Sequence, residues 1–584
     1  MRLRRAASVS IATIAIVLVV ACTAEVSAPS PAATTVPTAM PSPMATPMPA
    51  TPSPVPTGTT GPAPRVPVAI LVSDDAERAR LSAALDASPG FVTAESSANL
   101  AIADAPLPGA TPVVLARWVA ITDQRRDVLD LTRGDVLAIL GGEVRDWSEL
   151  GGAPQPIRVY LPASQAARIV NSLGVSASVL GAGLVLDDEL VSRVADTPGA
   201  FALVAPEELR LGVLALTVDG HDPYRDPAAD SPLRRERWVR APTASGAAAL
   251  AAAARLDSAP TLDPAGMLVT GQLLPARCSN LMLEIRDDYG AMFDGMRDAT
   301  MAADIAVSSL ESSLTALGTP TPCQETFVLQ GSPRAVDAIA EAGIDVVFPI
   351  GNHIGDCWGG CASALVIRDT LSRLHEAGVA TAGAGEDLAA ARSPALVTVA
   401  TAAGAVRFAF LGYDSMAPWV HATEHATGSA PMEPASIRED VAAALEVADH
   451  VVIGANWGVE YKADPTAFQR NMAGIAIEAG ASLVVGNHPH LVQAVEHFEG
   501  AVVSYAGGNF VFDQDWSEET AQSLVFELGF TAERLLGYRV RPVVVRGDEG
   551  EYDWIYRPEF VDPAGEGRPI LDRIWDAQDR LPER

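Results

Sequence analysis

Lysine is almost absent from this 584-residue chain, and aromatic residues make up only 5% of it. Lys462 is the single lysine, whereas Asp and Glu together number 72 and leave a formal net charge of −31. So acidic a surface repels phosphate groups, which argues against nucleic acid or anionic lipid as a partner. The scarcity of aromatic residues does not prevent folding, because 48% hydrophobic content is ample for the cores of several domains.

Long hydrophobic runs are also scarce, and the run from Ile11 to Val20 is too short to span a bilayer comfortably. Three arginines precede it and Val19-Val20-Ala21-Cys22 ends it, which is the pattern of an export signal over residues 1–22. The ending resembles a bacterial lipobox, and this resemblance implies that Cys22 becomes the lipid-modified first residue of an extracytoplasmic, membrane-anchored lipoprotein. The alternative is an ordinary signal peptide in which Cys22 is incidental.

Residues 23–65 have the composition of a tether. They are almost entirely Pro, Thr, Ala, Ser, Met and Val, without charge pairs or helical periodicity. Such a segment cannot bury a core, and it would reach ~40 Å when coiled or ~130 Å when fully extended. We expect it to hold the folded part away from the membrane.

Cysteine is scarce as well, with four residues besides Cys22. In an exported protein an even number of cysteines predicts disulfides, here two. The pairing that we favour joins Cys278 to Cys323 and Cys357 to Cys361. A zinc cluster is the alternative, although the spacing of these four residues is not that of a standard zinc finger.

Five polar signatures in the C-terminal half each follow, or lie close to, an apolar, strand-like run. This layout is typical of an α/β layered fold in which residues from several strand ends converge on one crevice. Their Glu, Asn and His side chains are ligand types for a hard or borderline divalent metal. The signatures are Ser309-Leu-Glu311-Ser, Gly351-Asn352-His353, Asn456-Trp-Gly-Val-Glu460-Tyr461, Gly486-Asn487-His488-Pro-His490 and Tyr505-Ala-Gly-Gly-Asn509-Phe-Val-Phe-Asp513.

At these residues the chain resembles the CapA family, the capsule and poly-γ-glutamate synthesis proteins with a calcineurin-like metallophosphatase fold. The resemblance implies a four-layer α/β domain, which we place at residues 267–545, followed by a C-terminal extension with a helix at 546–584. It also implies a role in building, attaching or processing an extracellular polymer. The last signature reads as structural, since Asn509 to Asp513 alternate like a strand after a tight turn.

The resemblance further implies a metal site and a catalytic acid. The metal ligands would be Glu311, Asn352, His488 and His490. His353 would act as the acid toward a leaving group. Two positions depart from the family pattern: its Gly-Asp is here Gly271-Gln272, and its His before Trp-Gly-Val-Glu is Asn456. Neutral amides bind divalent metals poorly, so a site without metal is also open.

Two functions therefore remain open for the C-terminal half. One is metal-assisted hydrolysis or transfer, since one metal is enough to activate water. The other is a non-catalytic envelope receptor or scaffold, whose degenerate site binds a small anion or a polymer end through His and amide donors. The ligand would be an extracellular polymer or a small anionic substrate in either case.

Residues 66–255 form a separate domain. Strand-like runs at Val68 to Leu71 and Val113 to Leu115 are followed by a capped helix and a Gly-rich turn within residues 131–157. This order resembles the periplasmic phosphate-binding proteins, which have a type II solute-binding fold. Their Ser-Gly-Thr anion loop is replaced here by Leu161-Pro-Ala-Ser164-Gln-Ala-Ala-Arg168, in which Ser164 reads as a plain N-cap. The sequence thus argues against phosphate transport.

Overall fold

The computed structural model describes residues 7–10 and 65–584, with several gaps. The gaps are residues 98, 164, 165, 167, 168, 171, 172, 174–183, 188, 257, 260 and 548–554. Cys22, the tether up to residue 64, and the Ser164 and Arg168 positions lie outside the described residues. The larger of two compact units contains Pro112–Trp238 and Leu256–Arg584, and the smaller contains Val239–Arg255 and residues 65–111. The domain boundaries expected from the sequence stay a prediction.

The smaller unit contains strands β2 (Val66–Leu71), β3 (Phe91–Ala94) and β4 (Ala101–Ala103), with helices α1 (Asp75–Asp86) and α5 (Ala244–Ala253). Strand β2 pairs in parallel with both β3 and β4. Asp74 begins α1 by accepting a hydrogen bond from the backbone N–H of Glu77, as an N-cap does. The chain leaves this unit at Thr111 and returns at Val239, through β5 (Ala110–Arg117) and β13 (Arg234–Arg240).

The segment from Pro112 to Trp238 contains a five-stranded sheet in the order β11-β6-β10-β8-β9. Its helix α2 (Arg133–Gly141) starts with the predicted cap, a reciprocal capping box between Thr132 and Asp135. Trp147 is completely buried in the core of this segment. The strands are β6 (Val119–Asp123), β8 (Arg158–Leu161), β9 (Val185–Leu186), β10 (Ala200–Val204) and β11 (Val213–Ala215).

The C-terminal half contains two large sheets. One has the order β19-β18-β15-β14-β29-β30-β31, with β28 also paired to β14, and the other has the order β1-β21-β22-β24-β25-β27-β26. The strands of the first sheet are β14 (Ala265–Leu273), β15 (Ile305–Leu310), β18 (Val346–Phe348), β19 (Ala380–Thr381), β28 (Asn509–Val511), β29 (Gln522–Phe530), β30 (Leu535–Arg546) and β31 (Arg557–Phe560). Those of the second are β1 (Ala7–Ser10), β21 (Ala395–Thr401), β22 (Gly404–Asp414), β24 (His450–Asn456), β25 (Leu483–Asn487), β26 (Val495–Phe498) and β27 (Ala501–Ser504).

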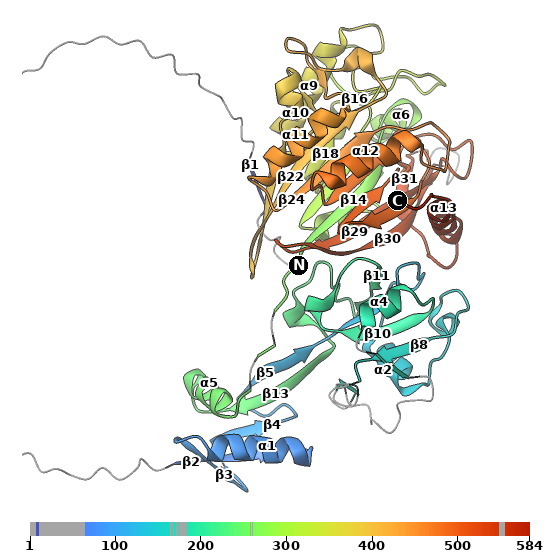
Figure 1. The fold of residues 1–584 in the computed structure, drawn as a ribbon. Coiled ribbons are helices and arrows are strands. Elements are labelled where there is room, and N and C mark those ends of the chain that lie inside the picture. Colours follow the sequence, from blue (N-terminus) through green and yellow to red (C-terminus); the bar gives the residue numbers. More distant parts are fainter. Residues whose placement is uncertain are drawn as a thin grey trace, which may run out of the picture. The chain divides into compact units, whose positions relative to one another are not determined.

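Alternate residues of the central strands face different layers, because successive side chains of a strand point to opposite faces. Val269 of the first sheet and Val452 of the second belong to the core between the sheets. Leu268 instead packs with helices α6 (Arg277–Arg286), α8 (Arg334–Glu341) and α9 (Ser363–Glu376). Ile453 packs with α11 (Pro434–Leu445) and α12 (Ala467–Glu478), which cover the second sheet in Figure 1. The predicted four-layer α/β arrangement is therefore confirmed.

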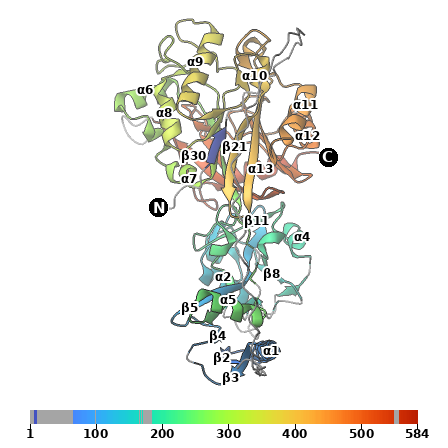
Figure 2. The ribbon, with the colours of Figure 1, turned by 90° about the vertical axis from the view of Figure 1, so that its left-hand side faces the viewer.

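Two elements from the ends of the chain lie against this half, and the first, β1, falls within the predicted export signal of residues 1–22, so a protein that begins at Cys22 would lack it. Strand β1 pairs with β21 in antiparallel register, and Figure 2 shows it as the short blue strand beside β21. The predicted C-terminal helix is α13 (Arg568–Asp579), whose Ile570 and Trp575 pack into the core between the sheets. None of the helices that the structure describes combines the length and apolar character that a bilayer span requires.

A buried ion pair joins the 112–238 segment to the first large sheet. Arg539 of β30 lies 3.0 Å from Asp222 and 2.8 Å from Glu527, and its side chain is 4% exposed. Next to it, Tyr224 packs against β29 and β30 where Gly529 and Gly537 carry no side chain; a Cβ at either glycine would lie 2.7 Å from Tyr224. These contacts fix Pro112–Trp238 to the C-terminal half within one compact unit.

Candidate functional site

Polar residues from both large sheets meet at the carboxyl ends of their strands. Gln272 lies near the end of β14, Glu311 directly follows β15, and Asn456 and Asn487 close β24 and β25. Asn456 and Asn487 are direct neighbours in parallel register. All four residues are at most 2% exposed, so their polar atoms must find partners inside the protein or in a ligand.

Glu311 is the centre of this cluster. Its Oε1 accepts a hydrogen bond from Nδ2 of Asn456 at 3.0 Å and lies 3.2 Å from Nδ1 of His488. Burial opposes ionisation of Glu311, but the hydrogen bond and charge of His488, together with His490 and His353, lower its pKa to about 2. Burial also lowers the pKa of His488, yet Glu311 outweighs this effect and raises it overall. The two side chains therefore form a buried ion pair.

Gln272 is held in one orientation by the backbone of the neighbouring motif. Its Oε1 accepts a hydrogen bond from the backbone N–H of His488 at 3.0 Å. Its amide nitrogen consequently faces Oδ1 of Asn509 at 3.0 Å and Nδ1 of His490 at 2.6 Å. An amide nitrogen has two hydrogens and no free lone pair, so Nδ1 of His490 must accept.

The tautomer of His490 follows from this contact. Oδ1 of Asn509 is 2.9 Å from the same ring nitrogen. The Nδ2 of Asn509 donates hydrogen bonds to Gln514 and Thr520. The amide oxygen of Asn509 is therefore the atom that faces Gln272, and it acts as an acceptor. Burial lowers the pKa of His490 and keeps the ring neutral. The proton of the neutral ring is therefore on Nε2, and this nitrogen presents an N–H group instead of a lone pair.

The motif that carries the two histidines has an unusual backbone. His488 and His490 have φ angles of 97° and 59°, in the left-handed region that favours glycine. Such residues cost about 1–3 kcal/mol each and persist only where the surroundings fix them. Both residues are 4% exposed. The strain supports a functional role for the His-Pro-His turn.

The Gly351-Asn352-His353 loop closes against the same cluster. Gly351 has a φ of 123°, and a Cβ there would lie 2.6 Å from Nδ2 of Asn456 and 2.9 Å from Cγ of Glu311. His353 is 13% exposed, and its Nδ1 lies 2.7 Å from Oδ2 of Asp356, which orients the ring. Gly351 thus places this loop at the edge of the site, and the roles expected for Asn352 and His353 stay predictions.

Two buried residues of this cluster escaped the sequence interpretation. Asn509, taken as part of a structural strand, begins β28 but also contacts both Gln272 and His490. Asn487 donates to Oγ of Ser309 at 2.7 Å and so links the two sheets. The pairing of β28 with β14 places Asn509 directly beside Gln272. The sequence offered only one signal for these residues, their position next to the recognised motifs.

The side chains fit a divalent metal only in part. Buried oxygens that need a donor or a cation are present, but Nε2 of His490 is protonated and cannot act as a ligand. Across the described ranges, no three His, Cys, Asp or Glu side chains gather as metal ligands would. The predicted set of Glu311, Asn352, His488 and His490 therefore does not fit a metal as a whole. Among the amide and carboxylate oxygens of the site motifs, those buried without a hydrogen-bond partner include Glu311 Oε2, Asn352 Oδ1, Asn456 Oδ1 and Asn487 Oδ1.

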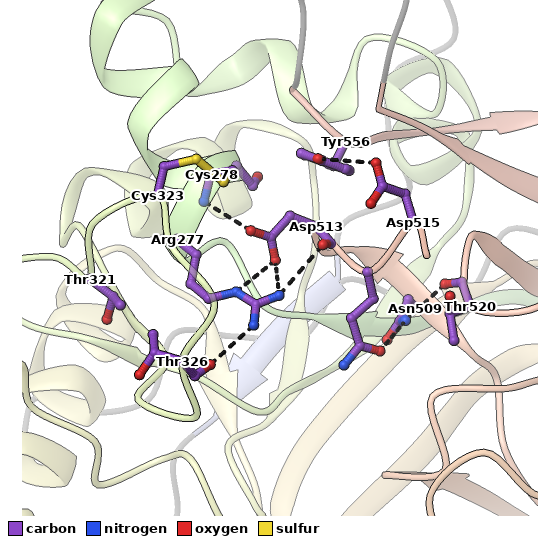
Figure 3. Close-up of polar contacts among 12 residues, drawn as sticks. Arg277, Cys278, Thr321, Cys323, Thr326, Asn509, Asp513, Asp515, Thr520 and Tyr556 are labelled. Carbon is purple, nitrogen blue, oxygen red and sulfur yellow. Dashed lines mark hydrogen bonds and ion pairs between the residues drawn. A yellow bond between two sulfur atoms is a disulfide. The ribbon is translucent and has the colours of Figure 1, made fainter. Parts of the chain in front are cut away.

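Disulfides tie down two loops of this half. The structure pairs Cys278 with Cys323 and Cys357 with Cys361, as expected from the sequence. The first bond joins the start of α6 to the segment after β16 (Ser313–Leu314) and is drawn in Figure 3. The second closes the loop that follows Asn352 and His353.

Comparison with known proteins agrees with this architecture. Residues 266–514 match the family described as "Bacterial capsule synthesis protein PGA_cap". The capsule biosynthesis protein CapA of Bacillus anthracis is 32% identical over 202 residues, which cover 34% of this chain and 47% of that protein. The C-terminal half of the chain is therefore similar to the CapA family, over residues 266–514. The chain spans about half the length of this relative.

Two solved structures resemble separate parts of the chain. A putative phosphate ABC transporter substrate-binding protein from Clostridium perfringens has 18% identity and a TM-score of 0.19, and covers 33% of this chain and 100% of its own. A putative 5'-nucleotidase from Staphylococcus aureus has 13% identity and a TM-score of 0.31, and the match covers 49% of this chain and 56% of that protein. The α/β class itself follows from the sheets and layers of the structure.

Proposed function

We propose that this protein is a lipid-anchored envelope protein that binds an extracellular polymer of the capsule or poly-γ-glutamate type during its assembly or processing. The observation that carries the proposal is the contact of Gln272 with His490. It leaves an N–H of His490 available where a metal ligand would present a lone pair. With unpartnered buried oxygens in the same cluster, the site offers both donors and acceptors. Hydroxyl and amide groups of a polymer need both.

The location rests on the sequence. The export signal that ends at Cys22, followed by the tether of residues 23–65, supports an extracytoplasmic protein on a lipid anchor. A site presented on such a tether can reach polymer that emerges from the membrane. A scaffold or receptor role needs no turnover, which agrees with the replacement of two ligand positions by Gln272 and Asn456.

Binding assays with the mature protein test this proposal. Immobilised poly-γ-glutamate and capsule-type polysaccharides would be offered to the protein with and without EDTA. We expect EDTA-resistant binding that weakens at least tenfold in His488→Ala, because the partner of Glu311 is lost. His425→Ala, which changes an exposed histidine, is the control. Binding that disappears with EDTA contradicts the proposal.

A metal-dependent hydrolase or transferase is the second candidate, and the four unpartnered buried oxygens favour it. A hard cation could be held by Glu311, Asn352 and Asn456 without His490, and it would supply Lewis-acid chemistry. His353, oriented by Asp356, would donate the proton. Turnover of model phosphoesters or capsule polymer that requires a divalent ion and is lost in Glu311→Gln would establish this function in place of the first.

A further inference from the structure

Two exposed aromatic rings lie next to the buried cluster. Tyr461 is 42% exposed and Trp516 is 58% exposed, and their rings meet edge to face with centroids 6.1 Å apart. They come from separate segments, after β24 and after β28. Large aromatic side chains gain free energy by burial, so a touching pair left in solvent indicates a contact surface. We call Tyr461 and Trp516 the aromatic pair.

Hydrogen bonds fix the segment that carries Trp516 on both sides of this residue, and Figure 3 shows most of them. Before Trp516, Asp513 accepts from Nε of Arg277 at 2.9 Å and from the backbone N–H of Cys278 at 3.0 Å. Asp515 accepts from the hydroxyl of Tyr556 at 3.2 Å. After Trp516, the carbonyl of Thr520 accepts from Asn509 at 2.9 Å. Trp516 is thus held in solvent by a preorganised loop.

Tyr461 connects this surface to the site. Its ring stacks on His490 with centroids 5.9 Å apart and an interplanar angle of 20°. Its backbone has a φ of 59°, and its N–H donates to the carbonyl of Pro489 at 2.8 Å. The hydroxyl accepts from Nε2 of Gln514 at 3.2 Å. A ligand that covers the aromatic pair would therefore lie directly beside the polar cluster.

The charge around the aromatic pair limits the ligand. Residues 459–463 and 514–519 contain four carboxylates and one lysine. Asp515, Glu518 and Glu519 are exposed; Arg573 lies 3.9 Å from Glu519, and the nearby Arg277 is committed to Asp513. A polyanion would meet like charges here, which costs free energy. Carboxylates instead accept hydrogen bonds, and hydroxyl groups supply them without adding charge.

We propose that the aromatic pair is a stacking subsite for a sugar ring of a neutral glycan, whose hydroxyls donate to the surrounding carboxylates. One apolar face of the sugar lies on Tyr461 and Trp516, and the chain continues toward His490. This inference rests on the proposed binding function and names its substrate class. It predicts that a neutral polysaccharide is preferred over polyanions such as poly-γ-glutamate or uronic-acid polymers.

A glycan array with neutral and uronic-acid oligosaccharides, together with immobilised poly-γ-glutamate, tests the inference on the mature protein. We expect binding to neutral glycans that falls about five- to tenfold in Trp516→Ala and in Tyr461→Ala, because one stacking ring is lost. Trp516→Phe should retain most of the binding, since it keeps an aromatic face. Trp419→Ala removes another exposed tryptophan, 72% exposed, and is the matched control.

The outcomes separate this inference from the proposed function. Preferred binding of poly-γ-glutamate or uronates, or neutral-glycan binding unchanged in Trp516→Ala, overturns the stacking subsite but leaves polymer binding intact. Failure to bind any polymer overturns both. Thermal unfolding of each variant shows whether it is folded. Because Trp516 is exposed, we expect Trp516→Ala to unfold at the same temperature as the native protein.

Discussion

The amide nitrogen of Gln272 lies 2.6 Å from Nδ1 of His490, although 218 residues separate them in the chain. This contact determines the chemistry that His490 offers. An aspartate in place of Gln272 would accept a hydrogen bond from Nδ1 and leave the lone pair of Nε2 free for a metal. The glutamine donates instead, so Nε2 retains its proton. One amide therefore converts a ligand-type histidine into a hydrogen-bond donor.

The buried pair of Asp222 and Arg539 should stabilise the larger unit in a pH-dependent way. Burial opposes ionisation of Asp222, but Arg539 outweighs it and lowers the pKa below 3.8. The stability that comes from a lowered carboxyl pKa is present above pH 3.8 and is lost as the pH falls through the folded-state value. Asp222→Asn should therefore cost about 3 kcal/mol at neutral pH, because it removes one of the two carboxylates that pair with the buried Arg539 and leaves only Glu527.

Urea unfolding at pH 7 and at about pH 3 measures this effect. The difference between Asp222→Asn and the native protein should narrow at the lower pH, because Asp222 is then protonated in the unfolded chain and folding must release that proton. Asp196→Asn, at an exposed position, is the matched control and should change little. Equal destabilisation at both pH values would show that lost packing, and not the ion pair, is responsible.

The two disulfides should differ in how much they stabilise the protein. Cys278 and Cys323 are 45 residues apart, whereas Cys357 and Cys361 are 4 apart. By loop-closure entropy, replacing the first pair by serine should cost about 4 kcal/mol and the second about 2 kcal/mol. Chemical unfolding of the two double variants checks the order. Mass mapping of the native protein should detect no free thiol among these four residues, and free thiols in all of them would contradict the pairing.

Membrane attachment should depend on Cys22. Cys22→Ser should still be exported but should appear in the soluble fraction, because the lipid is the only anchor that we propose. The double variant Cys357→Ser with Cys361→Ser is the control, since it removes cysteines without touching the signal. Cys22→Ser protein that stays fully in the membrane fraction would rule out the lipoprotein assignment.

The strands and their polar ends were predictable because they depend on local pattern. Apolar runs such as Leu483 to Val485 end where a polar motif begins, and β25 (Leu483–Asn487) does the same. Contacts between sheets were not predictable, because they join segments far apart in the chain. Gln272 reaches Asn509 across 237 residues, and Asp222 reaches Arg539 across 317. The sequence therefore identified site residues but could not show which atoms they turn toward each other.

The most direct test of the account compares the native protein with the double variant Gln272→Asp and Asn456→His. The quantities compared are the divalent-metal content and the metal affinity of the two proteins. The two changes add a carboxylate and an imidazole, and the new carboxylate would accept from Nδ1 of His490 and free Nε2. Both proteins would be purified without chelator, analysed for bound metal and titrated with Mn²⁺ and Zn²⁺ by calorimetry. Asn99→Asp, at an exposed position of the smaller unit, controls for added charge. We predict a metal-poor native protein and a double variant that binds at least tenfold more tightly. Stoichiometric metal in the native protein, or a double variant that binds no better, would contradict the account.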